Sequence, residues 1–247
     1  MEKFNDYDKE SAMTIVCKWV PALLIGVSLV LLGIFVRNGI SSISSNQRIV
    51  TVRGLSEREV EANKVTWPIV SKQVGNDLQS LYRQCAATDS AIVSFLKANG
   101  LSESEYQVNA PKVQDMQADS YSSTPAPYRY NVTAVVVVTS SQVKKVNELI
   151  NKVSQLMAQG IAIVAGDYNY QTLYEFTELN KIKPDMVADA TKNAREAAEK
   201  FAEDSKSKLG KIKSASQGQF TIDDRDQYTP WIKKVRVVST IEYYLKD

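Results

Sequence analysis

The sequence predicts an α+β protein in which an N-terminal transmembrane helix is followed by antiparallel sheets covered by helices, in the order β-β-α-β-β-α-β-α-β-β. Three observations lead to this prediction. An uncharged run of eighteen residues lies between Lys18 and Arg37. Beyond it, short segments alternate apolar with polar residues, as strands do, and longer segments repeat apolar residues at helical spacing. With 247 residues, 44% of them hydrophobic, the chain is long enough to bury a core.

The uncharged run, from Trp19 to Val36, is predicted to anchor the chain in a membrane. Its eighteen residues, at about 1.5 Å each in a helix, nearly match a hydrocarbon core of about 30 Å. A cleaved secretory signal is the alternative. The leader M-E-K-F-N-D-Y-D-K-E is mixed in charge and no A-x-A exit follows, so anchoring is favoured. Three lysines precede the run and three arginines follow it before residue 54, so the positive-inside rule does not decide the orientation.

Composition divides the chain into four predicted segments. Residues 1–14 form a tail, and residues 15–37 form the transmembrane helix. Residues 38–47 are rich in serine and asparagine and predict a short flexible linker. Residues 48–247 form the folded ectodomain.

The ectodomain begins with two predicted strands and a helix. Residues 48–55 and 65–74 alternate in polarity, which indicates strands. Pro68 cannot donate to a ladder, so the second strand is expected to lie at an edge or to be bulged there. Residues 77–97 repeat apolar side chains at helical spacing. Cys85 lies on that stripe and is interpreted as a core residue rather than a reactive thiol.

A third strand, an exposed loop and a central strand are predicted next. Residues 106–116 form the third strand, and the following A-D-S-Y-S-S-T-P-A-P-Y has the composition of a loop. Tyr121, Tyr128 and Tyr130 are a candidate contact surface; the alternative is a solvated loop with incidental aromatic residues. Residues 129–139 are apolar on both faces from Ala134 to Val138, which indicates a central strand that is covered on both sides or paired in an assembly.

A helix and an interrupted strand follow. The helix is predicted by an apolar stripe closed by Gly160, and the stripe consists of Val143, Val146, Ile150, Val153 and Met157. Residues 161–176 predict a strand with an interruption at Gly166.

The longest predicted helix of the ectodomain starts at Pro184, runs to Leu209 and is followed by Gly210. The face predicted to lie on a sheet consists of Val187, Ala190, Ala194, Ala197 and Phe201. Residues 211–222 and 231–245 then predict two closing strands, the second half-buried and antiparallel.

Residue types exclude several functions. The chain has no histidine, which removes the usual general base and the commonest metal ligand. Residues 1–37 hold four basic and four acidic residues, so the ectodomain is nearly neutral and lacks the basic surface of a nucleic-acid binder. Cys17 and Cys85 are not expected to pair. No P-loop, G-x-G-x-x-G or G-x-S-x-G motif occurs, so no catalytic residue, cofactor site or metal site is predicted. The acidic D-D-R-D of residues 223–226 is interpreted as a turn, because it lacks the spacing of a calcium loop.

Three stretches resemble a known family. They are R-I-V-T-V-R-G-L-S-E-R-E-V-E-A, then Y-R-Y-N-V-T-A-V-V-V-V with the V-N-E-L-I that follows, and the alanine-rich P-D-M-V-A-D-A-T-K-N-A-R-E-A-A-E-K-F-A-E-D-S-K-S-K-L-G-K-I. Together they resemble the SIMPL-domain family, formerly a domain of unknown function. The resemblance implies a single-pass protein of the bacterial inner membrane, with its tail in the cytoplasm and its ectodomain in the periplasm. It also implies a homo-oligomer, and it carries over no catalytic residues.

These observations lead to three hypotheses. The preferred one is a non-enzymatic, self-assembling scaffold or stress-related module of the cell envelope. The second is a binding module for a small ligand or another envelope protein, which would use the loop 121–130 and the aromatic segment 168–176. The third is a carboxylate-based hydrolase that uses Asp223, Asp224 or Asp226.

Overall fold

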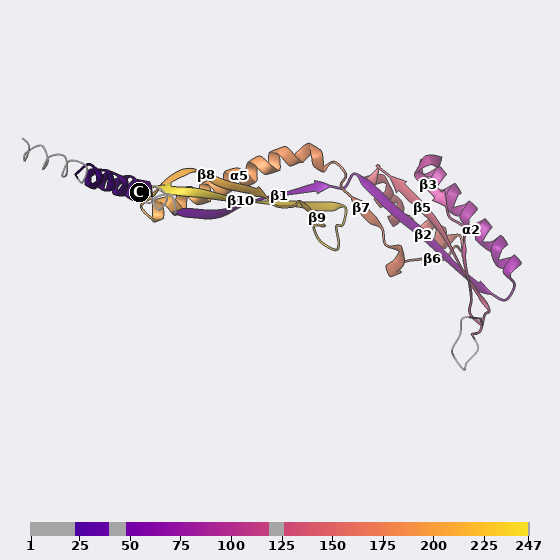
Figure 1. The fold of residues 1–247 in the computed structure, drawn as a ribbon. Helices are drawn as coiled ribbons and strands as arrows, with labels where there is room; N and C mark the ends of the chain where they lie inside the picture. Colours follow the sequence, from indigo (N-terminus) through magenta and orange to yellow (C-terminus); the bar gives the residue numbers. More distant parts are fainter. Residues whose placement is uncertain (1–22, 40–47, 119–125, 247) are drawn as a thin grey trace, which may run out of the picture. The chain divides into compact units, whose positions relative to one another are not determined.

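The computed structural model describes residues 23–39, 48–118 and 126–246 (Figure 1). Contacts divide the chain into two compact units. The one that we call the central unit comprises Leu55–Ala190 and Gly218–Val238. The other, the terminal unit, comprises the chain up to Gly54, Thr191–Gln217 and the chain from Ser239 onward. Antiparallel sheets and helices occur together, which confirms the α+β class.

The central unit is built on a mixed-length antiparallel sheet of six strands. Its two long strands are β2 (Lys64–Gly75) and β5 (Tyr130–Ser140), which pair without a break from Val65↔Ser140 to Gly75↔Tyr130. Short strands complete the sheet: β3 (Tyr106–Val108) and β4 (Lys112–Asp115) pair with β5, whereas β6 (Ile163–Val164) and β7 (Leu173–Glu175) pair with β2.

The strand that contains Pro68 was predicted to lie at an edge or to be bulged there. It is instead β2, an interior strand without a bulge against β5, and Pro68 faces a gap between two short neighbours. On one side Pro68 pairs with Val137 of β5. On the other side, β7 covers residues 64–66 and β6 covers residues 70–71, so neither strand pairs with Pro68. The missing N–H therefore breaks no ladder.

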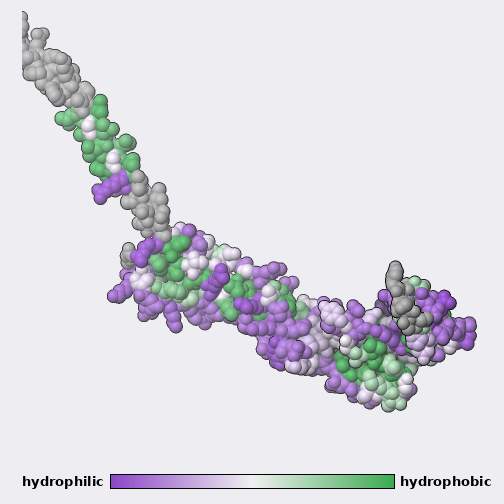
Figure 2. Space-filling view, turned by 90° about the horizontal axis from the view of Figure 1, so that it is seen from below, coloured by the Kyte–Doolittle hydropathy of each residue, from purple (hydrophilic) through white to green (hydrophobic). Residues whose placement is uncertain are grey.

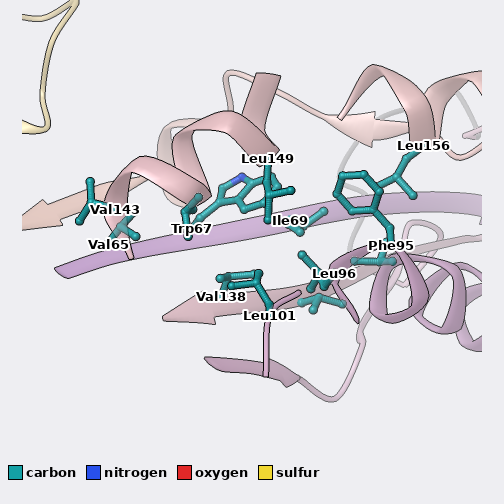
Figure 3. Close-up of a cluster of buried hydrophobic side chains, with 13 residues drawn as sticks. Val65, Trp67, Ile69, Phe95, Leu96, Leu101, Val138, Val143, Leu149 and Leu156 are labelled. Atoms are coloured by element: carbon teal, nitrogen blue, oxygen red, sulfur yellow. The ribbon is translucent and has the colours of Figure 1, made fainter. Parts of the chain in front are cut away.

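Three helices cover one face of this sheet: α2 (Leu78–Ala98), α3 (Val143–Asn151) and α4 (Ser154–Ala158). Figure 3 shows Trp67 and Ile69 of β2 among leucines from α3 and α4. These side chains are almost fully buried, and burial of each contributes about 1.5–3 kcal/mol before the cost of ordering. The core of the central unit is therefore made of large apolar residues.

The predicted helix of residues 143–157 is two helices rather than one. The first helix, α3, ends at Lys152, whose N–H donates to the carbonyl oxygens of Leu149 and Glu148. The change of direction buries Leu156 and leaves Met157 exposed. The predicted apolar stripe was therefore wrong at Met157, because Leu149 and Leu156 are the side chains that pack against the sheet.

In the terminal unit, a helix packs on a sheet through alanine side chains. Strand β8 (Lys208–Gln217) pairs with β10 (Ile232–Lys246) from Ser239↔Gln217 to Lys246↔Lys208, and β1 (Ile49–Glu61) lies on the other side of β10. The helix is the part of α5 (Leu179–Asp204) from Thr191 onward. The small core of this unit consists of Val52, Ala194, Ala198, Ile241 and Tyr243.

The buried stripe of α5 differs from the prediction. Its members follow one another at intervals of four residues: Met186, Ala190, Ala194, Ala198 and Ala202. Phe201, predicted on this face, is 60% exposed. A neighbouring stripe with smaller side chains is buried, because it allows the helix to approach the sheet more closely.

Both ends of α5 also differ from the prediction. The helix starts at Leu179 and contains Pro184, because Leu179 and Ile182 pack with the central-unit cluster around Met186 and Val235. At the other end, Lys206 adopts a left-handed φ of 55°, and the Ser207 N–H donates to the Ala202 carbonyl at 2.8 Å. This is a Schellman ending.

Gly210 is not the helix terminator. It lies within β8, where a Cβ would meet the Tyr244 carbonyl oxygen at 2.6 Å. Glycine is required at this position by a close backbone approach.

Three predicted strands are each divided in two, which gives the order β-β-α-β-β-β-α-α-β-β-α-β-β-β from β1 onward. Pro111 separates β3 from β4. Gly166, with a φ of 80°, separates β6 from β7. Gly218 separates β8 from β9 (Thr221–Asp224), and β9 pairs with residues 233–236 of β10. Pro111 cannot donate to a ladder and Gly166 has a left-handed φ, whereas the Gly218 N–H still donates to the Val238 carbonyl at 2.8 Å and the pairing register changes after it.

The described part of the predicted anchor is a helix of residues 23–39, with every side chain exposed. Figure 2 shows it as an apolar segment between two grey stretches. Val36 lies in this helix, whereas Trp19 and the tail of residues 1–14 lie outside the described residues. Within the described ranges, no helix combines the length and hydropathy needed to cross a membrane. The helix described from residue 23 holds only part of the uncharged run.

Candidate functional site

The candidate site is a groove of the central unit, and its first wall is α2. The helix begins where the Asp77 carboxylate accepts a hydrogen bond from the Ser80 N–H at 2.9 Å. Its buried stripe comprises Leu81, Cys85, Ile92, Phe95 and Leu96. Asp89 lies on the same stripe, one turn after Cys85. Asp89 therefore places a carboxylate among the apolar side chains of the α2 face that lies toward the sheet.

The second wall is the sheet edge formed by β3 and β4. The Asn109 N–H still donates to the Val135 carbonyl at 3.0 Å, but Pro111 has no N–H and interrupts the ladder. The start of β3 is held by Glu105, whose carboxylate accepts hydrogen bonds from the Ser140 hydroxyl, the Ser102 N–H and the Gln142 amide. These bonds lower the pKa of Glu105 to about 2, the Ser140 bond having the largest effect.

Two adjoining hollows between these walls make up what we call the α2 groove. The larger, about 590 Å³, is lined by Tyr82, Cys85 and Asp89 of α2 and by Val108 and Pro111 of the edge, among others. The smaller, about 450 Å³, shares Tyr82 and Pro111 with the first. Its remaining lining is largely apolar and includes Leu78, Val113 and Val132.

The polar groups of the α2 groove do not form a catalytic set. Burial, and next the charge of Asp89, raise the pKa of the Cys85 thiol, which donates to the Gln73 side-chain carbonyl. A thiol with a raised pKa is a poor nucleophile. Burial raises the pKa of Asp89, whose Oδ1 is buried without a hydrogen-bond partner. The groove is suited to binding an apolar group that brings a donor to Asp89.

The other face of the six-stranded sheet holds a smaller depression of about 350 Å³. Val135 and Val137 of β5 line it and are only half-buried, and Leu173 is 58% exposed. The central strand was predicted to be covered on both sides or paired in an assembly. One side of β5 is covered by helices, and its other side exposes part of the apolar surface of Val135 and Val137.

The predicted contact surface is only partly described. Tyr121 lies outside the described residues. Tyr128 is 48% exposed. Tyr130 is partly buried and packs against the cluster that contains Leu81 and Val132.

The D-D-R-D segment, predicted as a turn, is a turn only in its second half. Asp223 and Asp224 end β9 and pair with Lys234 and Lys233 of β10, whereas Arg225 and Asp226 begin the connection between the two strands. Asp226 accepts hydrogen bonds from the N–H groups of Tyr228 and Thr229, both at 2.8 Å, and Asp224 pairs with Lys233. The Thr229 hydroxyl and the Arg225 guanidinium hold the pKa of Asp226 well below its usual value. In the described part of the chain, no group of three or more acidic or cysteine side chains could hold a metal ion.

Sequence reasoning did not identify the α2 groove. The available signals were Asp89 on an apolar stripe and Pro111 within a predicted strand. Neither signal shows that the two segments face each other, because that depends on where β3 and β4 pair with β5.

Comparison with known proteins gives one family match. Residues 50–235 match the family described as SIMPL: Protein of unknown function (DUF541). This match confirms the resemblance drawn from the three stretches. No curated protein matches the chain.

Proposed function

We propose that this chain, which belongs to the SIMPL family of proteins of unknown function, is a non-enzymatic, membrane-anchored assembly module of the bacterial cell envelope. The observation that carries the proposal is the helix of residues 23–39, in which eleven large apolar side chains are exposed. Exposed apolar surface on this scale marks contact with a membrane or another protein.

The anchor is argued from the whole uncharged run. The described helix is shorter than a membrane span, but the run begins at Trp19 and continues to Val36. The family resemblance supports a periplasmic ectodomain and a cytoplasmic tail, whereas the basic residues on the two sides of the run are balanced.

Membrane extraction tests the anchor. The full-length chain, produced in a bacterium, is expected to stay in the membrane pellet after alkaline carbonate washing. Protease added to spheroplasts is expected to digest the ectodomain. The double variant Leu29→Arg and Leu31→Arg should leave the membrane, because each charge costs about 2.5–3.5 kcal/mol at a helix centre. Wild-type chain in the soluble fraction would refute the anchor.

Assembly is supported by the half-buried valines and the exposed Leu173 on the open sheet face. We expect the full-length chain in detergent to exceed monomer mass in light scattering. Val135→Lys should lower that mass, because a charge on the open face opposes contact between copies. Ala87→Lys, at an exposed position of α2 on the helix-covered side of the sheet, is the matched control. A monomer at high concentration would refute self-assembly.

The absence of an enzymatic activity is argued from the side chains. The chain has no histidine, and its buried cysteine is held as a thiol. The acidic turn is occupied by its own hydrogen bonds. A binding module is the second candidate function, and the α2 groove favours it.

A further inference from the structure

We propose that the α2 groove binds an extended peptide of a partner protein, which adds a strand to the β3–β4 edge and places a lysine or arginine against Asp89. The proposal does not depend on the anchor or on self-assembly. It rests on an open strand edge, apolar walls and one carboxylate oxygen without a partner.

The outer edge of β3 and β4 is open. Within the described chain, both strands pair only with β5. Because the Asn109 N–H bonds to Val135, the alternation of an antiparallel ladder directs the N–H and C=O groups of Tyr106 and Val108 away from β5. By the same reasoning, the bond from the Met116 N–H to Arg129 directs the groups of Val113 outward. An added strand would find its hydrogen-bond partners along this edge.

The groove has the dimensions of a short extended peptide. Along α2 its lining runs from Leu78 to Ser94, which is about 24 Å of helix. At about 3.3 Å per extended residue, this length accommodates about seven residues. The interruption at Pro111 lies within this length and leaves pairing positions on both sides of it.

The walls favour apolar side chains. Leu78, Tyr82, Val108 and Val113 are large apolar residues of the groove with 41–62% of their surface exposed. An extended peptide presents alternate side chains to one face, so every second residue of the ligand would meet this wall. Burial of these contacts supplies affinity without a sequence-specific code.

Asp89 supplies the selectivity. Its Oδ1 is inaccessible to solvent and lacks a donor, which is an unfavourable state for a carboxylate. The raised pKa of Asp89 has the same cause, burial without a compensating charge. Asp89 also lines the open groove, so a cationic side chain from the ligand would supply the compensating charge there, as complementary interfaces do.

Fluorescence anisotropy with the full-length chain in detergent tests the proposal. The probe is a labelled, end-blocked heptapeptide, Thr-Val-Thr-Lys-Thr-Val-Thr, in which the valines and the central lysine share one face. We expect saturable binding. Replacing the lysine with norleucine should weaken binding by about tenfold, and replacing it with glutamate should weaken it further.

Backbone pairing is tested by two further probes, N-methylated at the odd or at the even positions. Only one set of N–H groups faces the β3–β4 edge, so one probe should lose binding and the other should retain it. Equal binding by both would overturn the strand-addition mode.

Protein variants identify the site. Asp89→Asn should weaken the lysine peptide by about tenfold and leave the norleucine peptide unchanged. Tyr82→Ala, at an exposed wall position, should weaken both. Glu148→Gln, an exposed carboxylate of α3, is the matched control and should change neither. Circular dichroism verifies that each variant is folded.

Three further results, besides equal binding of the two N-methylated probes, would overturn the proposal. They are no binding of the lysine peptide at millimolar concentration, equal affinity for the lysine and norleucine peptides, and an unchanged affinity of Asp89→Asn. Loss of self-association on addition of the peptide would assign the groove to a second copy of the chain instead.

Discussion

The central and terminal units solve the same packing problem with side chains of different size. In the central unit, the sheet meets its helices through large residues such as Trp67, Ile69 and Phe95. In the terminal unit, α5 meets its sheet through Ala194 and Ala198. Large residues bury more surface, whereas alanines permit close contact and tolerate no added volume. We therefore expect the stability of the central unit to fall when side-chain volume is removed, and that of the terminal unit to fall when volume is added.

The largest expected effect comes from removing volume in the central unit. Trp67→Ala should lower the free energy of unfolding by about 3–5 kcal/mol, because it removes a buried indole and leaves a cavity. Urea denaturation followed by circular dichroism measures it. A loss below about 1 kcal/mol would contradict the packing of Figure 3.

The next effect comes from adding volume in the terminal unit. Ala194→Leu should cost about 1–3 kcal/mol, because the side chain at this position is fully buried against the sheet. Ala188→Leu, on the exposed side of α5, is the control and should remain within about 0.5 kcal/mol of the wild type. Equal unfolding midpoints for the two variants would remove the contrast between the units.

A smaller effect concerns the edge strand of the groove. Glu105→Gln should cost about 1 kcal/mol at pH 7, because it loses charge-assisted hydrogen bonds. The folded-state pKa of Glu105 is depressed from 4.5 to about 2, so its stabilisation is present above pH 4.5 and is lost as the pH falls toward 2. Unfolding midpoints of both proteins should therefore converge between pH 4.5 and pH 2. A constant difference across this interval would exclude the ionised carboxylate as the cause.

The smallest effect comes from the exposed side of α5. Arg195→Ala removes the pair with Glu199, in which Nε and Oε1 are 3.2 Å apart. Both side chains are largely solvated, so the loss should be about 0.3–0.5 kcal/mol and should disappear at high salt. Thermal unfolding at low and high salt measures it. A loss as large as that of Ala194→Leu would show that this face has an additional partner.

Long elements with one strong pattern were predictable from the sequence. The alternation in β10 and the stripe of α2 were predicted near their observed ends, because each pattern continues over many residues. Short elements were not. At Pro111 and at Gly218 the two halves pair with the same neighbour, β5 or β10, but in registers that differ by one residue, and a single strand does not carry that information.

The candidate site was predictable only in its parts. Asp89 and Pro111 can be read from the sequence, but only the tertiary structure shows that both line one groove. The contact surface of three tyrosines was predicted from composition alone. One of them, Tyr130, instead packs against the core cluster that contains Leu81.

By itself, the sequence determined the α+β class, the family, the missing histidine chemistry and the uncharged run from Trp19 to Val36. These properties depend on residue type and local period, which packing does not change. Only the tertiary structure decided which stripe of α5 is buried, where Gly210 lies and which sheet edge is open beside α2. Those outcomes depend on contacts between residues far apart in the chain, where space and hydrogen-bond partners select among locally equivalent alternatives.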